Sequence, residues 1–299
     1  MRLLNIHTLE LEEFFEQNIP PYFILSHRWQ GKEVTYKDFV KGRCSRDSPG
    51  YRKILECCNF VKEFHNSRYI RSFQEHPEGA LRDAMHRDKL QWVWIDTCCI
   101  DKRSSAELSE AINSMFAWYQ NAVVCIAYLS DVYSLTGSGS KAFKNSEWFR
   151  RGWTLQELLA PSVVVFCDVR WEVLGYLDKA VYPARGRCSR TAESKLAPLL
   201  TEKVSSATGI AERYLSKLRG TECSVWHASI AERMSWAADR KTTRKEDASY
   251  CLLGIFNVNM PLLYGEGSKA FHRLQEAIIQ SSNDKSIFDY DDTYFYDGP

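Results

Sequence analysis

The chain has 299 residues, 44% of them hydrophobic, and its 39 basic and 38 acidic residues leave a formal net charge of +1. This length can bury one large core or two modest ones, and the charge balance argues against a general binder of nucleic acid or membrane surfaces. There is neither an apolar run of membrane-spanning length nor the basic-then-apolar start of a signal peptide. The ten cysteines are therefore expected to be reduced thiols in a cytoplasmic protein.

Four short apolar runs predict strands that are buried on both faces. In chain order they are Phe23–Leu25, Trp92–Ile95, Val123–Leu129 and Val163–Phe166. Helical patterns lie between them. Ser104 and Glu107 have the spacing of a capping box, and the apolar residues after them trace one stripe. A second helix is predicted near Trp148–Leu159, where Pro161 stops it.

After about residue 170 the strand signal fades and helical patterns dominate. Three segments have helical patterns: "RMSWAADR", "TRKEDASYCLLGIF" and "SKAFHRLQEAIIQSS". The second begins with a predicted capping box from Thr243 to Glu246. Residues 135–141 and 183–195 have the composition of loops, and 65–90 that of an elaborated connection. The C-terminal segment "DYDDTYFYDGP" is acidic and aromatic, and its composition does not decide between order and disorder.

The alternation of strands and helices predicts an α/β fold with a parallel, flavodoxin-like sheet flanked by helices. We assign this sheet to residues 1–170 and a mainly helical remainder, packed on it, to residues 171–299. In such sheets ligands bind beyond the carboxyl ends of the strands. Three polar stretches are expected to meet there: Ser26–Trp29, Asp96–Lys102 and Ser130–Tyr133.

The segment "WFRRGWTLQELLAP" provides the sharpest local pattern. At about 100° per residue the leucines of this helix share one face, which is expected to pack on the sheet. Trp153 and Glu157, four residues apart, lie together on roughly the opposite face. This pattern suits either a ligand site or a solvated glutamate beside a tryptophan that the C-terminal helices bury.

Other chemistry has weaker support. A nucleophile pair of His27 with Cys98 or Cys99 is a minor alternative, because cysteines in apolar strand contexts are more often small core residues. The sequence contains neither C-x-x-C nor H-x-x-x-H, which argues against structural zinc, so no metal ligand is predicted. No Gly-rich phosphate loop follows a strand.

Four motifs together resemble the fungal heterokaryon incompatibility (HET) domain. They are "YFILSHRW", "WVWIDTCCIDKRSSAELSEAINSMFAWYQNA", "WFRRGWTLQELLAP" and "RMSWAADRKTTRKEDASYCLLGIFNVNMPLLYGEGSKAFHRLQEAII". The resemblance runs in order from about residue 20 to residue 282. It implies a cytoplasmic effector of incompatibility-type programmed cell death in fungal immunity, with an upstream nucleotide-binding receptor among its possible partners.

The HET family is in turn distantly similar to TIR domains. In TIR enzymes a glutamate four residues after a tryptophan cleaves NAD between nicotinamide and ribose. Carried over by motif, the catalytic position falls on Glu157, with Trp153 beside it. The resemblance also implies a TIR-like sheet and self-association into oligomers that raises activity.

This resemblance implies NAD as substrate, with no prosthetic group. The residues expected to bind NAD are Ser26, His27, Arg28, Trp29, Asp96 and Trp153. A carboxylate can stabilise the oxocarbenium-like state of the ribose, an aromatic ring can stack on the base, and arginine can hold the pyrophosphate. The alternative from a different class is a non-catalytic TIR-like module that self-assembles in cell-death signalling. Neither nucleic acid nor membrane is an expected partner.

Overall fold

The computed structural model describes residues 1–15, 18–64, 90–179, 199–216 and 224–289. The expected loop at 183–195 lies outside these residues, as do all but the last residue of the expected connection at 65–90 and nearly all of the tail. Where residues 135–141 were expected to be a loop, helix α7 (Ser138–Lys144) already begins.

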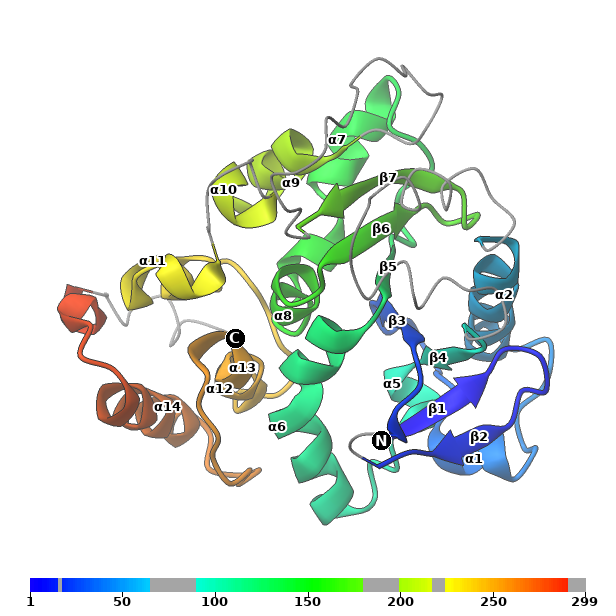
Figure 1. Ribbon diagram of the computed structural model, residues 1–299, viewed down its shortest axis with the longest axis horizontal. Coiled ribbons are helices and arrows are strands. Elements are labelled where there is room, and N and C mark those ends of the chain that lie inside the picture. The colour runs from blue at the N-terminus through cyan, green and yellow to red at the C-terminus, as the bar shows by residue number, and fades with distance from the viewer. Residues whose placement is uncertain (16–17, 65–89, 180–198, 217–223, 290–299) are drawn as a thin grey trace.

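A seven-stranded sheet organises the described residues (Figure 1). Its order is β2-β1-β4-β3-β5-β6-β7, and the central strands β4, β3, β5 and β6 are parallel. The outer strands β2, β1 and β7 pair antiparallel. Their bounds are β1 Arg2–Asn5, β2 Leu11–Glu13, β3 Tyr22–His27, β4 Trp92–Trp94, β5 Val124–Tyr128, β6 Val163–Cys167 and β7 Val173–Asp178.

The four parallel strands are the four predicted from apolar runs, which confirms the α/β fold. Taken in chain order they have the arrangement 2-1-3-4, the flavodoxin-like order, which reverses between β3 and β5. The three antiparallel strands were not predicted. Strands β1 and β2 are only four and three residues long, and β7 lies beyond residue 170 and is only partly buried.

Helices cover both faces of the sheet (Figure 1). Helix α2 (Pro49–Phe64) lies on one face, and α6 (Ser105–Asn121) and α8 (Thr154–Leu159) lie on the other. The shorter elements are α1 Tyr36–Val40, α5 Asp96–Cys99 and the 3-10 helix η2 Glu147–Arg150. The helix predicted near Trp148–Leu159 is therefore two helices, η2 and α8, separated where the Gly152 amide donates to the Lys241 carbonyl oxygen.

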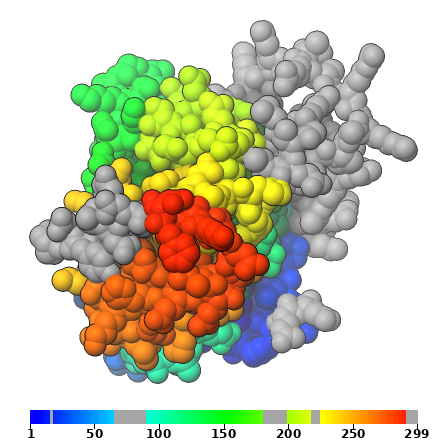
Figure 2. All heavy atoms as spheres, turned by 90° about the vertical axis from the view of Figure 1, so that its left-hand side faces the viewer, coloured from blue at the N-terminus to red at the C-terminus, as the bar shows by residue number. Residues whose placement is uncertain are grey.

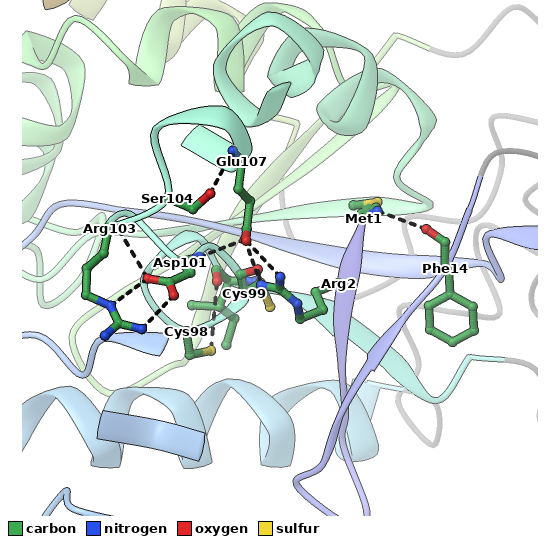
Figure 3. A network of polar contacts seen from close by, with 10 residues as sticks. Met1, Arg2, Phe14, Cys98, Cys99, Asp101, Arg103, Ser104 and Glu107 are labelled. Atoms are coloured by element: carbon green, nitrogen blue, oxygen red, sulfur yellow. Dashed lines mark hydrogen bonds and ion pairs between the residues drawn. The ribbon is translucent and has the colours of Figure 1, made fainter. Parts of the chain in front are cut away.

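An ion-pair network fastens strand β1, which lies next to the edge strand β2, to the start of α6 (Figure 3). The Arg2 guanidinium donates to both carboxylate oxygens of Glu107, at 2.7 and 2.8 Å. The same carboxylate accepts from the Asp101 amide at 2.7 Å, while Ser104 Oγ accepts from the Glu107 amide. The predicted capping box is thus half formed: the serine caps the helix, and the glutamate is used to hold β1.

The C-terminal part is helical, as predicted, and it forms most of the face in Figure 2. Its α-helices are α9 Thr201–Thr208, α10 Glu212–Leu215, α11 Ile230–Ser235, α12 Asp247–Tyr250, α13 Leu253–Phe256 and α14 Lys269–Ser281. The 3-10 helices are η3 Val225–His227 and η4 Lys285–Asp289. This part contacts the core where α13 packs on α6 and α9 packs on α7.

The second predicted capping box, from Thr243 to Glu246, does not form. Glu246 itself precedes α12, and its carboxylate accepts from the amides of Gly265 and Gly267, at 2.8 and 3.0 Å. Thr243 Oγ1 instead accepts from the Arg151 side chain at 3.4 Å. The Glu246 carboxylate, which the local pattern assigned to the helix N-terminus, therefore binds amides of the loop at Gly265 and Gly267 instead.

Helix α13 approaches α6 so closely that only glycine fits at the contact. A Cβ atom on Gly254 would lie 2.1 Å from the Cβ atom of Phe116, and this backbone has no room to retreat because the neighbouring residues are buried. This contact therefore fixes the C-terminal helices against the core.

We expect Gly254→Ala to destabilise the protein by about 2 kcal/mol or more, because the added methyl group overpacks the contact between α13 and α6. Urea unfolding measures this loss. The control is a double-mutant cycle with Phe116→Gly, which removes both the clashing Cβ atom and the ring: the two losses should be less than additive. Additive losses would mean that the two residues do not oppose each other across this contact.

Candidate functional site

The three polar strand ends meet, as the sequence predicted, at the carboxyl edge of the sheet. The Trp29 indole, after β3, donates to Asp96 Oδ2, after β4, at 3.0 Å. The Gln30 side chain donates to Ser130 Oγ, after β5, at 2.7 Å. This edge includes the point between β3 and β5 where the strand order reverses, the usual place for a ligand in an open α/β sheet.

Glu157 lies at this edge within a chain of buried polar groups. The Ser26 hydroxyl, in β3, donates to Glu157 Oε2 in a short hydrogen bond. The Trp148 indole donates to Ser26 Oγ at 2.8 Å, so the serine links indole and carboxyl group. The Tyr119 hydroxyl, which donates to the Leu25 carbonyl oxygen at 3.2 Å, also interacts with Glu157. Residues from β3, η2 and α6 thus form this chain of polar groups around the carboxyl group of α8.

The orientation of Glu157 differs from the sequence prediction. The helix was expected to bury its leucines and turn Glu157 away from the sheet, but all six residues of α8 are buried and Glu157 faces β3. Only 7% of its surface is exposed. The physical reason is that α8 is enclosed on all sides, by the sheet, by α6 and by the segment around Arg240, which a single-helix pattern cannot reveal.

Burial raises the pKa of Glu157 to about 8, because the ionised carboxylate loses its hydration. The hydrogen bonds from Ser26 and Tyr119 and the charge of Arg151 favour the ionised form but do not offset burial, and the negative charge of Asp96 opposes it. Glu157 is therefore mostly protonated at pH 7. A nearby positive charge would favour its ionisation.

A second cluster surrounds Asp96. Its carboxylate accepts from Trp29 and from Lys102 Nζ, the latter at 3.1 Å, and this ammonium also lies 3.5 Å from the centroid of the Trp29 ring. Burial raises the pKa of Asp96, but the Lys102 charge, His27 and these hydrogen bonds together leave it below its usual value. Asp96 is therefore ionised at neutral pH.

His27 lies beside Asp96 but is not paired with it. Its Nε2 atom is 3.9 Å from Asp96 Oδ1, too long for a hydrogen bond, and has no partner among the described residues. Burial lowers the pKa of His27 to about 4, so the ring is neutral at pH 7. Successive side chains of a strand point to opposite faces, which places His27 on the face away from Ser26 and Glu157.

The remaining predicted residues lie apart from the Glu157 cluster. Trp153 precedes α8, and its side chain hydrogen-bonds Asp247, at the start of α12; the tryptophan linked to Glu157 is Trp148. Arg28 is half-buried, and within the described residues it forms neither a hydrogen bond nor an ion pair. The structure thus joins Ser26 to Glu157 and Trp29 to Asp96, and it does not gather all the predicted residues into one cleft.

Sequence reasoning missed several residues of the Glu157 cluster. Arg240 reaches in from the C-terminal part, where its Nη1 atom donates to the Arg151 carbonyl oxygen and to Thr154 Oγ1, both at 3.0 Å. Its Nη2 atom is buried without a partner among the described residues, and burial lowers the pKa of this guanidinium to about 10. Tyr119 belonged to the apolar stripe of its helix. Neither residue carries a local signal, because each reaches the cluster only through folding.

Metal and thiol chemistry find no support in the described ranges. No group of three or more His, Cys, Asp or Glu side chains there is arranged to hold a metal ion. Cys98 is buried, and its contact with Cys99 together with burial raises its pKa well above the usual value, the opposite of what a nucleophile needs. In the same part of the chain, no helix combines the length and apolarity needed to cross a membrane.

The raised pKa of Glu157 predicts a pH-dependent difference in stability between the protein and its Glu157→Gln variant. The folded state keeps a proton that the unfolded chain, with a pKa near 4.5, releases. This contribution is fully present below about pH 4.5 and is lost as the pH rises through about 8. Relative to the variant, the protein should lose stability by about 1.4 kcal/mol per pH unit within this window.

Urea unfolding of both proteins between pH 5 and 9 measures this difference, and Glu147→Gln, at an exposed glutamate ten residues earlier, is the matched control. A pH-independent difference between Glu157→Gln and the unchanged protein would contradict a protonated Glu157.

A known protein family and a known protein match this chain. The family model described as "Heterokaryon incompatibility protein (HET)" matches residues 22–140. The chain is 40% identical over 269 residues, 87% of its length, to the vegetative incompatibility protein HET-E-1 of Podospora anserina, of which it spans 16%. No solved structure matches the chain significantly. The chain belongs to the heterokaryon incompatibility (HET) family.

Proposed function

We propose that this protein is an effector of incompatibility-type programmed cell death that hydrolyses NAD at the bond between nicotinamide and ribose. The similarity to HET-E-1 supports the first part, because that relative is a vegetative incompatibility protein. One observation carries the second part: the Glu157 carboxyl group is buried at the carboxyl edge of a flavodoxin-like sheet and hydrogen-bonded to Ser26. NAD is proposed as the substrate, with no prosthetic group.

The proposed chemistry uses Glu157 as a carboxylate. Cleavage of the N-glycosidic bond leaves positive charge on the ribose, and a carboxylate in a site of low dielectric constant stabilises that charge strongly. Nicotinamide leaves as a neutral base when the bond breaks; water then adds to the ribose carbon and releases one proton to the solvent. Ser26, held by Trp148, would keep the carboxylate in position.

The protonation state of Glu157 provides a link between binding and reaction. In the free protein its pKa of about 8 keeps it mostly neutral at pH 7. The nicotinamide ring of NAD is cationic, so its approach favours release of the proton from Glu157. The proposal therefore needs the substrate itself, or a rise in pH, to generate the active carboxylate.

The other proposed contacts with NAD involve the remaining predicted residues, most of which lie outside the Glu157 cluster. Arg28 would hold the pyrophosphate, and Trp153 would stack on the base. Ser26, His27, Trp29 and Asp96 would form the cofactor-side wall. Because His27 is on the opposite face from Glu157, NAD would have to cross the end of β3 to reach both.

Glu157→Gln should reduce NAD cleavage by about 10²–10³-fold, because glutamine keeps the size of the side chain but cannot carry the stabilising negative charge. The measurement is nicotinamide released by the purified protein, together with cell killing and cellular NAD at matched protein levels. The control is again Glu147→Gln, which should leave both unchanged. A Glu157→Gln variant that still kills cells while NAD stays constant would favour the non-catalytic, self-assembling module.

The pH profile provides an independent check of the same assignment. If ionised Glu157 is the active form, kcat/KM should rise with pH and level off above about pH 8. A profile that falls across this range would mean that the protonated form is required, and would rule out Glu157 as the stabilising carboxylate.

We further propose that the protein acts in the cytoplasm and that self-association raises its activity, with a nucleotide-binding receptor as an upstream partner. The eight cysteines among the described residues are all free thiols, as a reducing compartment requires. Specific activity should increase with protein concentration as oligomers form. Activity assays paired with light scattering test this: constant specific activity from a monomer at all concentrations would contradict it.

A further inference from the structure

A cavity of about 410 Å³ opens at the carboxyl edge of the sheet, separate from the Glu157 cluster. Its walls come from the start of α2, from Gln30 after β3, from Tyr128 at the end of β5 and from the turn between β6 and β7. It thus borders the ends of β3 and β5, between which the strand order reverses. Its volume suits a small-molecule ligand.

This cavity and Glu157 lie on opposite faces of the sheet. Ser26 pairs with Ala127, and His27 pairs with Tyr128, in the register of β3 and β5. Ser26 points to Glu157 on the face of α8, so the next row, with Tyr128, points to the face of α2. The residues that α2 contributes to the cavity agree with this placement. The cavity is therefore a site distinct from the proposed catalytic one.

Two aromatic rings form one wall. The rings of Tyr128 and Trp171 are stacked, with centroids 4.5 Å apart and planes inclined by 21°. The Tyr128 hydroxyl donates to the Val169 carbonyl oxygen at 3.2 Å, which holds its ring in place. Both side chains are half-buried and line the cavity. A planar ring can add to this pair by stacking.

The cavity is also lined by charged side chains. Three cationic side chains line the cavity, but Lys53 is paired with Glu33 at 2.6 Å and Arg170 is paired with Asp168 and Glu172. Arg52 has only a 3.7 Å contact with Asp47, and both of these side chains are largely exposed. Such a contact contributes little, which leaves the Arg52 guanidinium able to bind an anion.

The position of Arg52 at the start of a helix strengthens this preference. Arg52 lies in the first turn of α2, a helix of 16 residues that begins at Pro49, and its N-terminal end favours negative charge. Glu56, one turn later on the same wall, makes no hydrogen bond with the described residues and can accept from hydroxyl groups.

From these features we infer that the cavity between α2 and the β6–β7 turn binds a nucleoside monophosphate: its base stacks on Tyr128 and Trp171, its phosphate contacts Arg52, and its ribose hydroxyls donate to Glu56. This inference does not depend on NAD cleavage, because neither Glu157 nor Ser26 takes part.

The test is isothermal titration calorimetry of the full chain with AMP. We expect saturable binding that Arg52→Ala weakens by about ten-fold or more, the usual loss for a charge-assisted hydrogen bond. Trp171→Asn should weaken it by about ten-fold through lost stacking. Asparagine is chosen because the Trp171 backbone has φ of 64°, which asparagine tolerates. If Trp171→Asn does not fold, Arg52→Ala, at an exposed position, remains decisive.

The controls separate this site from others. Lys62→Ala makes the same change of charge ten residues along α2 and outside the cavity, and it should leave AMP binding unchanged. Glu157→Gln should also bind AMP normally, whatever its effect on NAD cleavage. Absence of AMP binding, or equal binding by Arg52→Ala, would overturn the inference. Inorganic phosphate binding as tightly as AMP would equally overturn it, because the aromatic wall would then have no role.

Discussion

The position of β3 between β4 and β5 is the constraint on which the rest of the structure depends. All six residues of this strand are buried, and it forms parallel pairs on both sides. Because side chains alternate along a strand, Ser26 and His27 leave it towards opposite faces. One residue connects to Glu157 and the next lies beside Asp96. A shift of the register by one residue would exchange the two faces and disrupt both clusters.

Burial decides the chemistry at each cluster in a different way. Glu157 has two hydroxyl groups near it but no direct ion pair among the described residues, so desolvation dominates and its pKa rises. Asp96 is near Lys102 and remains ionised at neutral pH despite its burial. The two carboxyl groups are contributed by different helices at the same edge of the sheet. Glu157 is mostly protonated at pH 7, whereas Asp96 is ionised, and this difference favours separate roles for the two carboxyl groups.

The C-terminal helices are part of this arrangement rather than an appendage. Arg240 donates to the segment that begins α8, and Gly254 packs against Phe116 of α6. Both contacts hold the helices that present Glu157 and Tyr119. Opposite them, α2 and the β6–β7 turn enclose a cavity with an aromatic wall and an available arginine. The carboxyl edge of one sheet thus offers two chemically different environments, one on each face.

The sequence by itself determined the central sheet, because strands buried on both faces require continuous apolar runs, and it placed three polar stretches at one edge. It also marked Ser26 and Glu157 as candidate site residues. Only the tertiary structure decided that these two residues, 131 positions apart, form a hydrogen bond. It also decided that Trp148 rather than Trp153 contacts Ser26, and that Arg240 donates to the segment that begins α8. The strand-end rule, applied to the fourth predicted strand, would also have pointed to Arg170 and Trp171. That rule could not have predicted that Trp171 stacks on Tyr128, nor that α8 is enclosed on every side. Such packing brings together segments that are far apart in the chain, and it leaves no periodic pattern in the sequence of any of them.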